Sequence, residues 1–76
     1  WMDVTLWRSA TQRMSDAICL AYPELAAKVQ GREDELVAEL AGLHEYGQNA
    51  VASIPESQRI LITSHDAFQY FGRAYG

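Results

Sequence analysis

The last seventeen residues, Ile60 to Gly76, read ILITSHDAFQYFGRAYG and decide the predicted fold. Ile60 to Thr63 form a run of β-branched or apolar residues, which is typical of a short strand buried on both faces. Ser64, His65 and Asp66 then end the run with residues that favour turns and helix N-caps. Behind them, apolar residues recur at helical spacing, namely Phe68, Phe71, Ala74 and Tyr75. A strand that feeds a helix is half of a βαβ unit, so the fold class that we expect is α/β.

His65 follows the predicted strand directly, at the edge of an open α/β sheet where ligands bind. Neutral imidazole is a common ligand of zinc and other transition metals. On residue type alone, a single His at a strand end is more often a hydrogen-bonded structural residue than a metal ligand. A catalytic triad of Ser64, His65 and Asp66 is excluded, because triad members face one another whereas consecutive side chains point apart. An enzyme built on His65 would need a nucleophile or carboxylate partner that the sequence does not display.

Two long helices are predicted upstream of this stretch. The first covers residues 3–22, with Asp3 or Thr5 as its N-cap, and Pro23 ends it. Its apolar stripe consists of Leu6, Trp7, Ala10, Met14, Ala17, Ile18 and Ala21. The second helix covers residues 24–54, and its spaced apolar or small residues are Leu36, Leu40, Leu43, Gly47, Ala50 and Ile54. This spacing fits either a weak coiled-coil seam or a helix on the flank of a larger protein. Because the helix contains three glycines, which weaken it, we expect it to need packing partners.

Composition limits the classes of function that remain open. The chain has 76 residues, 49% of them hydrophobic, and a net charge of −4. Because acidic and basic residues are mixed, no basic patch for a phosphate backbone forms, and we expect no nucleic-acid partner. No apolar run approaches the roughly 20 residues that span a bilayer. Cys19 stands among apolar neighbours and is predicted to be a buried, unreactive thiol. His44, within the long helix, is predicted to be solvent-facing or to have a hydrogen-bonded structural role.

The sequence TSHDAFQYFGRAYG, with SIPESQR before it and WMDVTLW at the front, resembles the zinc/manganese solute receptors of ABC importers. The resemblance runs along the whole chain but covers only a middle slice of the family's pattern, so we expect residues 1–76 to be a single fragment. It implies a two-lobed metal receptor in which residues 3–22 end the N-terminal lobe. Residues 24–54 would be the long helix that links the lobes, and residues 60–76 the strand and helix that begin the C-terminal lobe.

The same resemblance implies a function. Such receptors capture Zn²⁺ or Mn²⁺ in the periplasm or at the cell surface, with or without a lipid anchor, and deliver it to an ABC permease. They are binding proteins and not enzymes, and a role in cell adhesion is proposed for some of them. His65 falls at a position where the family has a His or Glu metal ligand, and His slightly favours zinc over manganese.

The resemblance places the other ligands outside this chain. One would stand two positions before Trp1, one further upstream, and a carboxylate downstream of Gly76. The residues alone leave an alternative open, a free-standing helical protein-interaction module without metal.

Overall fold

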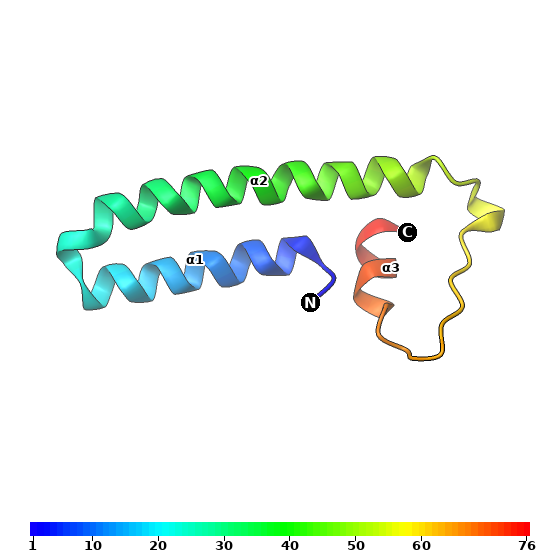
Figure 1. Ribbon diagram of the computed structural model, residues 1–76, viewed down its shortest axis with the longest axis horizontal. Helices are drawn as coiled ribbons and strands as arrows, with labels where there is room; N and C mark the ends of the chain where they lie inside the picture. Colours follow the sequence, from blue (N-terminus) through cyan, green and yellow to red (C-terminus); the bar gives the residue numbers. More distant parts are fainter.

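The computed structural model describes residues 1–76 as three α-helices and two short 3₁₀ turns. The helices are α1 (Val4–Ala21), α2 (Ala26–Ala52) and α3 (Gln69–Tyr75), and the turns are η1 (Pro23–Leu25) and η2 (Glu56–Gln58). Helices α1 and α2 form a long antiparallel hairpin closed by η1 (Figure 1). The chain then makes a wide loop after α2 and returns, so that α3 lies near the N-terminus (Figure 1). The molecule is elongated, with extents of 52 × 24 × 14 Å.

Local signals explain where the two long helices begin and end. Asp3 is extended and caps α1, because its carboxylate accepts the backbone N–H of Thr5 at 3.0 Å. Pro23 ends α1 and opens η1, where its missing N–H costs nothing. At the other end of the hairpin, the Arg59 side chain donates to the carbonyls of Ile54, at 2.8 Å, and Ala52, at 3.4 Å. These bonds satisfy carbonyl oxygens that the end of α2 leaves without a helical partner.

The hairpin packs through a narrow seam of mainly small or polar residues. The partly covered residues of α1 are Val4, Ala10, Thr11, Ser15 and Cys19. Those of α2 recur in steps of three and four, namely Ala26, Val29, Glu33, Val37, Leu40, His44, Gly47 and Val51. This spacing is typical of two helices that share a continuous seam. Ser15 is 5% exposed, and its hydroxyl finds no hydrogen-bond partner, so close approach of the helices takes precedence over polar pairing there.

Most residues of the apolar stripes identified in the sequence lie outside this seam, and only Ala10, Leu40 and Gly47 belong to both. Leu6, Trp7 and Met14 of α1 remain 46%, 51% and 64% exposed. Leu36 and Leu43 of α2 remain 42% and 53% exposed. At 3.6 residues per turn, both stripes are displaced from the seam in the same rotational sense, so in an antiparallel pair they lie on the same side. The hairpin therefore presents one apolar face that nothing in this chain covers.

The predicted α/β fold is wrong, because the chain contains no strand and no sheet. Ile60, Leu61 and Ile62 lie in coil and are 75%, 63% and 89% exposed, so the predicted buried strand is absent. A strand forms only where a neighbour accepts its N–H groups and donates to its carbonyls. Helices occupy most of the remaining chain and offer no such neighbour. The last helix begins at Gln69, with Phe68 as its cap, and not directly after the predicted turn and cap residues Ser64 to Asp66.

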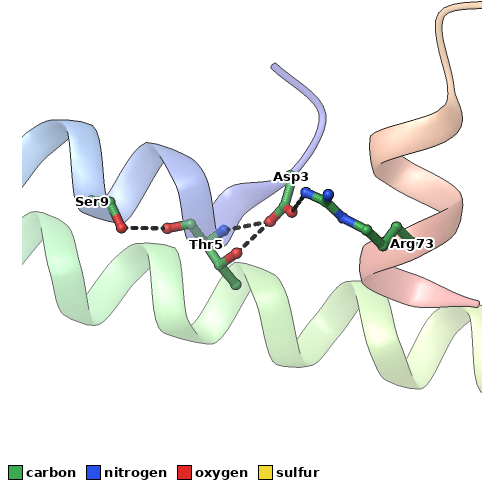
Figure 2. A network of polar contacts seen from close by, with 4 residues as sticks. All are labelled: Asp3, Thr5, Ser9 and Arg73. Carbon is green, nitrogen blue, oxygen red and sulfur yellow. Dashed lines mark hydrogen bonds and ion pairs between the residues drawn. The ribbon is translucent and has the colours of Figure 1, made fainter.

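Helix α3 is tied to the start of α1 by an ion pair between residues 70 positions apart. Arg73 Nη2 lies 3.4 Å from Asp3 Oδ2, beside the hydrogen bonds that Asp3 accepts from Thr5 (Figure 2). The Thr5 hydroxyl bond is the largest cause that lowers the pKa of the Asp3 carboxyl; burial opposes the shift, and Arg73 adds to it. The charged carboxylate is therefore the form that this arrangement favours.

We predict that the first turn of α1 loosens in acid. Because the pKa of Asp3 is lowered on folding from its usual 3.8, the stabilisation by its charged form is complete above about pH 4. It is lost as the pH falls through the lowered pKa. Amide-exchange protection of Leu6 and Trp7, whose N–H groups bond Asp3 O, measures this loss. The loss should be smaller in Asp3→Asn, whereas Asp16→Asn, on the same helix, should respond like the unmodified chain. An unaltered acid response in Asp3→Asn would assign the effect to another carboxylate.

Candidate functional site

His65 lies in a tight turn that leads into α3. Its backbone carbonyl accepts two hydrogen bonds, from the Thr63 hydroxyl at 2.7 Å and from the Ala67 N–H at 3.0 Å. The next residue, Asp66, accepts the side-chain amide of Gln69 at 2.8 Å, which joins the turn to the first residue of α3. The His65 side chain itself is exposed, and its imidazole makes no hydrogen bond or ion pair. The backbone of His65 is thus held while its side chain stays available to a ligand.

His44 has a different environment on α2. It lies on the seam, and its ring centroid is 5.3 Å from that of Tyr75, at an interplanar angle of 44°. Its Nδ1 atom is buried and has no hydrogen-bond partner. We therefore assign His44 a packing role between α2 and α3. The sequence predicts a solvent-facing or hydrogen-bonded His44, whereas the structure has a half-buried ring that packs on Tyr75 and an Nδ1 atom without a partner.

The residues present do not form a complete metal site. No group of three or more His, Cys, Asp or Glu side chains is placed where it could hold a metal ion. Cys19 is a free, half-buried thiol on the α1 side of the seam, and so its predicted full burial is not reached. Zinc sites in proteins usually need three or four ligands in fixed geometry. The chain therefore holds no complete zinc site of its own, and His65 stays a predicted ligand.

A cavity of about 480 Å³ lies inside the wide loop, between the end of α2 and α3. Thr63 and Asp66, on either side of His65, line it, together with apolar residues that include Ile54, Ile60, Leu61, Phe68 and Phe71. This cavity is not predicted from the sequence, because the segment from Ile60 to Thr63, which helps to line it, has the pattern of a strand. No local pattern indicates a loop that folds back on the preceding helix. None of the helices combines the length and apolar character needed to cross a membrane.

Comparison with known proteins gives a match along the full chain. The family described as zinc-uptake complex component A, periplasmic, matches residues 1–76. The zinc-binding protein TroA of Treponema pallidum is 34% identical over 76 residues, which are 100% of this chain and 25% of that protein. The manganese-binding lipoprotein MntA of Bacillus subtilis is also 34% identical over 76 residues, again 100% of this chain and 25% of the relative.

A third relative has a less specific name. The metal-binding protein YtgA of Chlamydia pneumoniae is 33% identical over 75 residues, or 99% of this chain and 23% of that protein. No solved structure matches the chain. The chain thus spans about a quarter of the length of the curated relatives that it matches. Because the family match covers every residue, the resemblance found in the sequence is confirmed, and the chain belongs to the zinc-uptake complex component A family of periplasmic zinc/manganese receptors.

Proposed function

We propose that this chain is one segment of an extracytoplasmic receptor that captures Zn²⁺ or Mn²⁺ and delivers it to an ABC permease. The observation that carries the proposal is the family match over residues 1–76. Relatives named as zinc-binding and manganese-binding proteins support the choice of metals. The words periplasmic and lipoprotein in these names support a location outside the cytoplasmic membrane. The metal is cargo that is bound and released unchanged, so the receptor acts as a binding protein and not as an enzyme.

We also propose how this segment is placed in the receptor. Residues 3–22 would end the N-terminal lobe, residues 24–54 would link the two lobes, and residues 60–76 would begin the C-terminal lobe. The length of α2 supports this placement, since 27 residues at about 1.5 Å each give a helix of about 40 Å. The exposed apolar face of the hairpin supports it too, because such a face needs further partners to leave water.

His65 would be the metal ligand that this segment supplies. Its exposed, unpaired imidazole and its fixed backbone are suited to that role. The remaining ligands would come from other segments of the receptor, since no three His, Cys, Asp or Glu side chains of this chain are placed to hold a metal ion together. For a given nitrogen donor, intrinsic affinity rises from Mn²⁺ to Zn²⁺, so a His at this position favours zinc.

A second candidate is a free-standing helical interaction module without metal. The observation in its favour is the hairpin's exposed apolar face, with Leu6, Trp7 and Met14 on α1 and Leu43 on α2. Such a module would bury this face by self-association. Sedimentation of the 76-residue chain separates the two proposals. A cooperatively folded dimer would favour the module, whereas a weakly folded monomer is the result expected for a receptor segment.

In the intact receptor, we predict that His65→Ala lowers the affinity for Zn²⁺ by roughly a hundredfold, or about 2.7 kcal/mol. The fold should persist, because the His65 side chain is exposed and makes no polar contact. His44→Gln is the matched control, since it removes the other imidazole of the chain. Its loss of Zn²⁺ affinity should be at least about tenfold smaller than the loss in His65→Ala. Titration calorimetry gives both values. Similar losses in the two variants would remove the basis for choosing His65.

We predict that the isolated 76-residue chain does not bind Zn²⁺ or Mn²⁺ stoichiometrically at micromolar concentrations near neutral pH. A single imidazole leaves water to complete the coordination shell, and such binding is weak compared with three or four fixed protein ligands. Calorimetry of the isolated chain tests this prediction. A one-to-one site of sub-micromolar affinity that His65→Ala abolishes would mean that this segment carries a complete site.

A further inference from the structure

Gly47 differs from the other two glycines of α2 in what lies above its α-carbon. A Cβ atom built on Gly47 would lie 2.8 Å from Tyr75 Cε1 and 3.2 Å from both Cδ1 and Cζ. The same atom built on Gly31 or Gly42 would meet nothing within 4 Å. Carbon atoms in favourable contact are about 3.5–4.0 Å apart. The Tyr75 ring therefore rests on the bare backbone of α2, in space that any side chain at position 47 would occupy.

Tyr75 is the central packing residue of α3. It is 9% exposed and is the only buried apolar residue of the chain. Its ring centroid lies 4.8 Å from that of Phe71 and 5.3 Å from that of His44. The other tie of α3, the Arg73–Asp3 ion pair, joins an Arg73 side chain that is 63% exposed to an Asp3 side chain that is 6% exposed, and it leads to the start of α1. The contacts of Tyr75 with Gly47 and His44 are thus the ones that attach α3 to α2.

This contact is linked to His65 by local hydrogen bonds. Within α3, the Gly72 N–H donates to Phe68 O at 2.9 Å. At the start of α3, the Gln69 side chain donates to the Asp66 carboxylate. Just before the helix, the Ala67 N–H donates to His65 O. On the other side of His65, residues 60–63 are exposed, and the Thr63 hydroxyl bonds His65 O within the turn itself and not α2. The position of His65 relative to α2 therefore depends on where α3 is docked.

We propose that Gly47 is a positioning residue for His65. Because Gly47 has no side chain, the Tyr75 ring can pack on the backbone of α2. This packing holds α3, and the turn that carries His65, against the long helix. The part of this inference that concerns metal rests on the proposed function, whereas the part that concerns the turn does not. A glycine inside a helix otherwise only weakens it. The contact with Tyr75 gives Gly47 a role that Gly31 and Gly42 do not have.

The test compares Gly47→Ala with Gly42→Ala and Gly31→Ala in the intact receptor. All three changes give α2 a better helix former, so helix propensity alone predicts equal, stabilising effects. Only Gly47→Ala meets Tyr75. We expect amide protection of Ala67 and of residues 69–75 in the metal-free receptor to fall in Gly47→Ala and to stay unchanged in the two controls. We further expect Gly47→Ala alone to lower Zn²⁺ affinity, by about tenfold, as for residues that orient a ligand.

A second substitution tests whether the ring itself is the cause. Tyr75→Leu in the Gly47→Ala background removes Cε1 and Cζ, two of the three ring atoms nearest to the new methyl group. It should restore part of the protection at Ala67 and part of the affinity. If Gly47→Ala instead caused general misfolding, this second substitution would restore neither. Equal protection and affinity in the three alanine variants would overturn the inference, as would protection lost at residues 69–75 with Ala67 unchanged.

The two proposals fail in different ways. Absence of both Zn²⁺ and Mn²⁺ binding by the unmodified receptor would overturn the proposed function, while loss of Ala67 protection in Gly47→Ala alone would still support the positioning of the turn. Normal Zn²⁺ binding by the unmodified receptor, with affinity unchanged in Gly47→Ala, would instead overturn the role of Gly47 and leave the proposed function intact.

Discussion

Close packing of α1 against α2 along small side chains is the constraint on which the rest of this structure depends. With Ala10, Ser15 and Cys19 on the α1 side, the seam brings together few large side chains and excludes little apolar surface from water. Only 3 of 76 residues are buried, and two of these, Asp3 and Ser15, are polar. Hydrogen bonds within the helices therefore account for much of the regular structure, since 43 of the 55 backbone hydrogen bonds lie within helices. Hydrophobic burial, the dominant favourable term in folding, is therefore small within these 76 residues.

The same constraint decides what α3 can do. A helix of seven residues is too short to be stable by itself, so it persists only where it packs. The seam supplies that place at Gly47, where the absence of a side chain on α2 leaves room for an aromatic ring. Gly47 thus serves the docking of the segment that carries His65. Asp3 serves two elements, since it caps α1 and pairs with Arg73 of α3 (Figure 2).

Features encoded by neighbouring residues could be predicted from the sequence, and features that join distant residues could not. The Asp3 cap and the Pro23 stop predict an α1 close to the observed Val4–Ala21. The prediction of a strand at Ile60 to Thr63 used a sound local signal, but a strand also needs a partner that lies elsewhere. The apolar stripes were identified correctly as apolar, yet their position does not tell which face meets the other helix. The Asp3–Arg73 and Gly47–Tyr75 contacts leave no local trace.

Recognition of His65 as a candidate ligand shows how the two kinds of information combine. Residue type did not separate His65 from His44, and the family resemblance supplied the choice. The structure gives a physical contrast between them, since the His44 ring is packed against Tyr75 and the His65 ring is free. A ligand also needs a fixed backbone, because a donor on a mobile loop pays ordering entropy whenever it binds. A site assembled from distant segments keeps its geometry only while each segment stays in place. The contacts that hold the His65 turn would then bear on metal affinity as directly as the imidazole itself.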